Sequence, residues 1–292
     1  MDFFKKNKIL TILLLILSFY LYTNYFFLIE KNPKVDKDSP TYINDLYASD
    51  ERIYNTYLDS TEKKIYKKLV DASLNHKGTV KTTIKNKESS VMDVYNAILV
   101  DHPELLNFGS LAYQYDNLGN YEITVSSATP IEFLTRINIS RIERMIYKIK
   151  KETQNMSEYG KIRYVYDWIG KNTKYDKTFT SMSKNQSIYN VFINKNAVCA
   201  GFAKASQIIF QNIGIESYGV LGETTGAHMW NIVKYKGKYY FFDATVAASI
   251  KQDSKYYYDG LKQTQMEDYI MDNPEWYPKV KKQIWNKEKR YE

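Results

Sequence analysis

The sequence is poor in the residues that build covalent cross-links and metal sites. It contains one cysteine, Cys199, and three histidines, His76, His102 and His228. A single cysteine excludes an internal disulfide and a zinc site of several cysteines, and the histidines are widely separated along the chain. We therefore expect no metal and no cofactor.

Dense basic clusters are missing as well. The chain has 41 Lys and Arg residues against 33 Asp and Glu, so its net charge is +8, and this charge is spread along its length. Nucleic-acid binding normally requires a concentrated basic patch, so we expect no nucleic acid as a partner. The positive balance fits an anionic lipid surface or an acidic polymer of the cell envelope.

Residues 9–29 form a long apolar run without a charged residue, and they follow a short basic N-terminal tail, 1–8. As a helix at about 1.5 Å per residue the run would span about 31 Å, close to the hydrocarbon thickness of about 30 Å. A cleaved signal peptide is the alternative. The run is long for a signal peptide and no small-x-small cleavage site follows it, so we expect an uncleaved transmembrane helix.

The remaining organisation follows from composition. Residues 30–40 are polar with two prolines, which is typical of a linker. Residues 41–150 read as a helical and mixed N-terminal region, and 151–292 as a catalytic domain. Lysines in the basic tail favour an N-terminus inside the cell, although further lysines follow the span. We therefore expect a single-pass protein of the cell membrane with an extracytoplasmic catalytic domain.

Cys199 opens a helical run, AGFAKASQIIFQNIG, that Gly214 can terminate. A cysteine at a helix N-terminus feels the positive end of the helix dipole and nearby free N–H groups. Both stabilise the thiolate, which is the nucleophilic form. A lone cysteine is more often a buried core residue, so this position alone does not establish a nucleophile.

Two strand-like runs, AHMWNIVKY and KYYFFDA, flank Lys236 and Gly237, which is a hairpin signal. With a two-residue loop, or a four-residue loop in the same register, Tyr235 pairs with Lys238. A three-residue loop would shift the register by one residue and turn each side chain of one strand to the other face.

The first register has a chemical consequence. It puts Asp243 opposite Trp230 and makes it a diagonal neighbour of His228 on the same face. His228 would take the proton of Cys199 and later return it to a leaving amine, and Asp243 would orient the imidazole. The backbone N–H of Cys199 would supply part of an oxyanion hole.

Three further residues are candidates for the substrate pocket or the oxyanion hole. We expect Trp230 to line the substrate pocket, a role that is compatible with core packing. Gln186 and Tyr189 lie just upstream of the cysteine, and either is a candidate oxyanion donor.

The motifs VCAGFAKA and AHMWNIVKYKGKYYFFDAT resemble the bacterial branch of the transglutaminase-like superfamily. That family carries Cys-x-Gly-Tyr/Phe-Ala at a helix start, His-x-Trp-Asn on a strand and Asp-x-Thr on the next strand. Its catalytic triad falls on Cys199, His228 and Asp243, and the resemblance covers about residues 160–246. It implies an α+β fold in which the cysteine helix packs on an antiparallel sheet carrying the histidine and aspartate.

The resemblance also implies a chemistry. A membrane-anchored thiol enzyme would perform acyl transfer or amide hydrolysis through a cysteine thioester, on a protein or an envelope peptide. Whether an amine or water accepts the acyl group stays open. The alternative is a non-catalytic binding or scaffolding module on the same fold. A papain-like peptidase is disfavoured because that family usually has Asn where this chain has Asp243.

Overall fold

The structure is a computed structural model, and it describes residues 49–74, 79–83, 88–106, 108–109, 111–118, 120–125, 132–178, 185–249 and 269–281. All of them belong to one compact unit, Tyr42–Glu292. The predicted tail 1–8, transmembrane helix 9–29 and linker 30–40 lie outside the described residues. Within the described part of the chain, no helix is long and apolar enough to cross a membrane.

Helices and strands are interspersed along the described residues. The helices are α4 (Arg52–Tyr57), α5 (Ser60–Leu74), α6 (Glu88–Asp101), α7 (Glu132–Thr153), α8 (Glu158–Asn172), the π-helical η1 (Asn190–Asn194), α9 (Cys199–Asn212), α10 (Ala244–Ser249) and the 3-10 helix η2 (Pro274–Trp276). The strands are β1 (Thr79–Thr83), β2 (Leu111–Tyr115), β3 (Asn120–Val125), β4 (Lys174–Tyr175), β5 (Asn196–Ala197), β6 (Ser217–Glu223), β7 (Ala227–Tyr235), β8 (Lys238–Phe242), β9 (Ile270–Met271) and β10 (Val280–Lys281).

The central sheet has five strands in the order β10-β8-β7-β6-β9. Strands β6, β7, β8 and β9 pair antiparallel with their neighbours, whereas β10 pairs parallel with β8. The predicted α+β fold with an antiparallel sheet is therefore confirmed, with one parallel strand at an edge. A strand of two residues shows no periodicity, so the sequence did not reveal it.

The β7–β8 hairpin has the predicted register. Lys236 and Gly237 both have positive φ angles, 47° and 71°, and form the two-residue turn. Turns with two positive φ angles match the twist of the flanking strands. Tyr235 pairs with Lys238 as expected, and the ladder runs on to Phe242.

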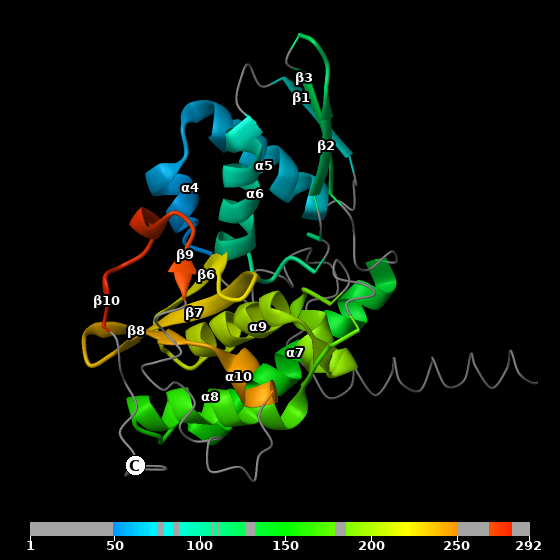
Figure 1. Cartoon of the computed structure of the whole chain (residues 1–292). Coiled ribbons are helices and arrows are strands. Elements are labelled where there is room, and N and C mark those ends of the chain that lie inside the picture. Colours follow the sequence, from blue (N-terminus) through cyan, green and yellow to red (C-terminus); the bar gives the residue numbers. More distant parts are fainter. Residues whose placement is uncertain are drawn as a thin grey trace, which may run out of the picture. The chain divides into compact units, whose positions relative to one another are not determined.

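One face of the central sheet meets helix α9. Asn231 on β7 is fully buried, and its side-chain amide donates to the carbonyl oxygen of Ala203 on α9 at 3.0 Å. Val233 and Phe242 from the same face join a core with α7, α8, η1 and α9. Figure 1 shows α9 between this sheet and the helices α7 and α8.

The opposite face of the sheet is covered by the N-terminal part of the chain. Val220, Trp230 and Ile232 are buried in a second core that also contains residues of α4, α5, α6 and β3. Strand β3 is the middle of a separate antiparallel sheet, β1-β3-β2. Residues upstream of 150 thus pack directly on the sheet, while a domain boundary near 150 stays a prediction.

Candidate active site

Cys199 is the first residue of α9 and is half-buried. The residue before it, Val198, is extended, and no side chain caps the helix. The first N–H groups of a helix have no partner within the helix, so they are available near the thiol. The strand β5 leads into this turn and is held by β4, with Tyr175 opposite Ala197.

Gly201 lies in the first turn of α9, where another segment approaches the helix closely. A Cβ atom at this position would lie 3.0 Å from the Cβ of Ala197 and 3.1 and 3.2 Å from the carbonyl oxygens of Asn185 and Ser187. The glycine therefore allows the segment that precedes the cysteine to pack against the start of the helix. This packing fixes the turn from which the thiol projects.

His228 and Asp243 come together as the register requires. His228 Nε2 lies 2.8 Å from Asp243 Oδ2, although the two residues are 15 positions apart in the chain. His228 stands near the start of β7, and Asp243 follows the last residue of β8. The hairpin thus brings His228 and Asp243 into contact.

Asp243 is almost fully buried, and both of its oxygens accept hydrogen bonds. Oδ1 accepts from the backbone N–H of Thr245 at 2.8 Å, and Oδ2 also accepts from the hydroxyl of Tyr269 at 2.7 Å. Burial raises the pKa of a carboxyl group, but the bonds from His228, Tyr269 and Thr245 outweigh it and hold the pKa of Asp243 below its usual value. The carboxylate is therefore ionised at neutral pH.

Two neighbouring groups, the carboxylate of Asp243 and the thiol of Cys199, affect the pKa of His228. Burial lowers its pKa, but hydrogen bonds with Asp243 and Cys199 and the charges of both groups raise it, and the pKa of His228 reaches about 10. Because Nε2 faces Asp243, Nδ1 is the ring nitrogen left for Cys199. An imidazolium between a thiolate and a carboxylate is the charged pair that activates a cysteine nucleophile.

Aromatic rings fix the imidazole from behind. Trp230 stacks on His228 at a centroid distance of 5.9 Å, and it is only 1% exposed. Tyr269 packs edge-on against both rings, and Phe241 packs edge-on against Trp230. The indole of Trp230 packs against the imidazole, and its role in lining the substrate pocket stays a prediction.

Tyr175 lies close enough to Cys199 and Asp243 to feel their charges. Burial and the nearby charges of Cys199 and Asp243 raise the pKa of Tyr175. Its ring stacks on Phe202 of α9 at 6.2 Å, which places the phenol beside the first turn of the helix. Tyr175 could not be recognised from the sequence, because nothing in a short KYD stretch marks one tyrosine among 28.

The two oxyanion candidates upstream of the cysteine have different positions. Gln186 follows Asn185, whose carbonyl accepts from the N–H of Val198 at 3.0 Å, so its backbone is fixed close to the Cys199 turn. Tyr189 precedes η1 and packs against the α9 core. A role of either residue in an oxyanion hole stays a prediction.

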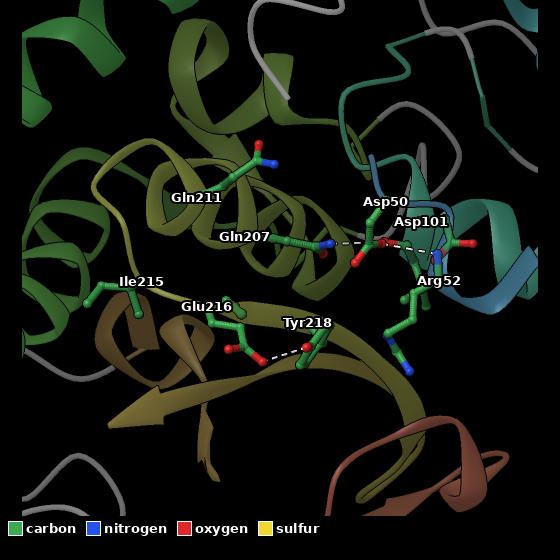
Figure 2. A pocket seen from close by; sticks show the side chains of 10 residues that line it. Asp50, Arg52, Asp101, Gln207, Gln211, Ile215, Glu216 and Tyr218 are labelled. Carbon is green, nitrogen blue, oxygen red and sulfur yellow. Dashed lines mark hydrogen bonds between the residues drawn. The ribbon is translucent and has the colours of Figure 1, made fainter. Parts of the chain in front are cut away.

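A cavity of about 150 Å³ lies at the far end of α9. Figure 2 shows Gln207 and Gln211 beside it, eight and more residues beyond Cys199, or about 12 Å along the helix. Its carboxylates already have donors: Asp101 accepts from two backbone N–H groups, and Glu216 accepts from tyrosine hydroxyls. The cavity is separate from the Cys199 site.

Metal binding was tested on the described residues as well. Among them, no group of three or more His, Cys, Asp or Glu side chains could hold a metal ion.

Comparison with known proteins identifies the domain around this site. A family model described as the transglutaminase-like superfamily matches residues 122–244. Over this range the chain is similar to the transglutaminase-like superfamily. The matched range includes Cys199, His228 and Asp243, and it ends before Tyr269.

Solved structures show more distant likenesses. A protein of Cytophaga hutchinsonii, provisionally named a cysteine protease, is 16% identical, with a TM-score of 0.31 over 47% of this chain and 62% of that one. A structure named a TGase is 15% identical, with a TM-score of 0.35 over 61% and 54%. The periplasmic domain of TgpA from Pseudomonas aeruginosa is 12% identical, with a TM-score of 0.30 over 44% and 56%. The chain thus covers less than two thirds of each of these structures. No curated protein matches it.

Proposed function

We propose that the chain is a thiol enzyme in which Cys199, His228 and Asp243 form a catalytic triad. One observation carries the proposal: His228 Nε2 lies 2.8 Å from Oδ2 of the buried and ionised Asp243, and Asp243 and Cys199 together raise the pKa of His228. A structural cysteine needs neither a basic partner nor an oriented one. The transglutaminase-like superfamily domain around these residues supports the same reading.

The proposed reaction is acyl transfer through a thioester. The Cys199 thiolate attacks the carbonyl carbon of an amide, and the carbon–nitrogen bond breaks as the His228 imidazolium gives its proton to the leaving amine. An amine or water then attacks the thioester carbon, His228 takes the proton of that nucleophile, and the Cys199 sulfur leaves as the thiolate. Backbone N–H groups at the start of α9 lie where they can stabilise the negative oxygen of each intermediate.

The substrate and the location belong to the same proposal. We infer a protein or envelope peptide as the acyl donor and a cell-membrane position through residues 9–29, with the domain outside the cytoplasm. The apolar run and the net charge of +8 support this location.

The test is alkylation of Cys199 by iodoacetamide as a function of pH, in the full chain and in His228→Ala. Because Cys199 is the only cysteine, the label reports this site alone. We expect the wild type to react well below the free thiol pKa of about 8.5 and the variant to lose this reactivity. Equal profiles with an ordinary thiol pKa would overturn the triad and favour a binding or scaffolding module.

A further inference from the structure

Tyr269 contacts the same oxygen of the Asp243 carboxylate that faces His228. Its hydroxyl donates to Oδ2 at 2.7 Å, and the same oxygen lies 2.8 Å from His228 Nε2. The other oxygen is held by the N–H of Thr245. The carboxylate cannot rotate away from the imidazole without breaking bonds on both oxygens.

Ring packing holds the Tyr269 hydroxyl in place. The phenol ring lies edge-on to Trp230 at 5.0 Å and stacks on Phe241 at 5.9 Å. Burial and the charge of Asp243 raise the pKa of Tyr269, so the hydroxyl stays protonated and remains a donor. The Tyr269 hydroxyl is therefore held in a fixed direction as a donor to Asp243.

The backbone of this segment reaches the site through a contact that only glycine allows. Strand β9 begins directly after Tyr269 and pairs with β6, where Gly222 lies opposite Met271 on one side and opposite His228 on the other. A Cβ atom on Gly222 would lie 2.0 Å from the carbonyl oxygen of Ile270. The absence of a side chain thus lets β9 approach the strand pair next to His228.

We propose that Tyr269 is a positioning residue that orients Asp243, and through it His228, for the reaction of Cys199. The inference rests on the proposed function and extends the site to a residue 26 positions beyond Asp243, outside the range that matches the family. Tyr269 touches no reacting atom. It acts by keeping one oxygen of Asp243 toward the imidazole.

The experiment compares Tyr269→Phe with the wild-type full chain by the pH dependence of Cys199 alkylation. The substitution removes one hydroxyl and keeps the ring. We expect the rate at pH 7 to fall about tenfold, since one charged hydrogen bond is lost. We also expect the acid limb of the profile to move to higher pH, because Asp243 then takes up a proton more readily.

Tyr277→Phe is the matched control. Tyr277 is also a buried tyrosine of the C-terminal segment, and its hydroxyl lies 3.5 Å from the N–H of Leu221. Its removal should leave the alkylation profile unchanged.

A second variant tests whether the position of strand β9 affects the reactivity of Cys199. Gly222→Ala should displace β9 and shift the profile as Tyr269→Phe does. The new Cβ atom would also lie 2.7 Å from Cη2 of Trp230, so Gly222→Ala should lower the reactivity of Cys199 at least as much as Tyr269→Phe does. A wild-type profile in Tyr269→Phe would overturn the inference. If the wild type itself shows no dependence on His228, the proposed function fails instead.

Discussion

His228 and Asp243 meet at 2.8 Å because Lys236 and Gly237 close a two-residue turn. A three-residue turn would have moved Asp243 to the other face of the sheet. The distance between these two side chains is therefore set by backbone angles at Lys236 and Gly237, seven and six positions before Asp243.

Replacing Asp243 by asparagine keeps the volume and removes the charge. The imidazolium of His228 then loses its buried counter-ion, and the amide can also present an N–H to the ring and select the wrong tautomer. We expect the alkylation rate of Cys199 at pH 7 to fall, and any acyl-transfer turnover to drop about a thousandfold. The measurement is the single-cysteine alkylation rate, with circular dichroism as the check on folding. An Asp243→Asn protein as reactive as the wild type would contradict the role of this carboxylate.

The charge on His228 predicts a pH dependence of stability. Its pKa is raised to about 10, so the folded state favours the protonated ring. Because the ordinary histidine pKa is about 6.5, the stability that this charge contributes is present in full below about pH 6.5 and is lost as the pH rises through about 10. The melting temperature of the wild type minus that of His228→Gln, measured between pH 6 and 10.5, should fall along this window. A constant or rising difference would show that His228 is not held as a cation.

Replacement by alanine should lower stability at one glycine near the site, Gly201, and not at another, Gly226. Gly201→Ala places a Cβ atom within 3.0 to 3.2 Å of three neighbours, two of them backbone oxygens that cannot move cheaply. We expect a loss of about 1–3 kcal/mol in the free energy of unfolding and a lower reactivity of Cys199. Gly226→Ala is the control, since a Cβ atom there meets nothing within 4 Å. Chemical denaturation of both variants gives the comparison, and equal stabilities would refute the tight approach at Gly201.

Lys204 is a buried cation on α9, only 1% exposed. Burial lowers its pKa to about 8, although the charge of Glu104 opposes this. A depressed lysine pKa means that the charge costs stability in full below about pH 8, and that the cost disappears as the pH rises past about 10.4. Lys204→Met should therefore stabilise the chain by about 1–3 kcal/mol at pH 7 and by less at pH 10.

The control for Lys204 is Lys171→Met, on the exposed end of α8. An exposed lysine makes no comparable contribution, so its removal should change the free energy of unfolding by no more than about 0.5 kcal/mol. A Lys204→Met protein that is less stable than the wild type would show that the ammonium group is satisfied in the core.

The sequence predicted the part of the site that depends on local rules. Turn chemistry at Lys236 and Gly237 set the hairpin register, and a helix start placed Cys199. Tyr269 could not be found in this way. Its contact with Asp243 depends on the two-residue strand β9, which has no periodicity, and on the bare backbone of Gly222 across the sheet.

The same limit applies to the fold. The helices with strong apolar periodicity, such as α8 and α9, have the expected positions, because burial of one face dictates them. Which face of the sheet the N-terminal helices would cover was not readable from their own pattern. That choice depends on side chains of β6 and β7 far along the chain, among them Val220 and Ile232.

The packing of Trp230 bears on how small a working fragment can be. The indole that supports His228 is buried against the helices α4 to α6, which begin at Arg52, and against Trp276 and Tyr277 near the C-terminus. A fragment cut to the matched range 122–244 would leave this tryptophan and its neighbours bare to water, and would also lack Tyr269. The smallest fragment that keeps these contacts therefore extends well past both ends of the matched range 122–244.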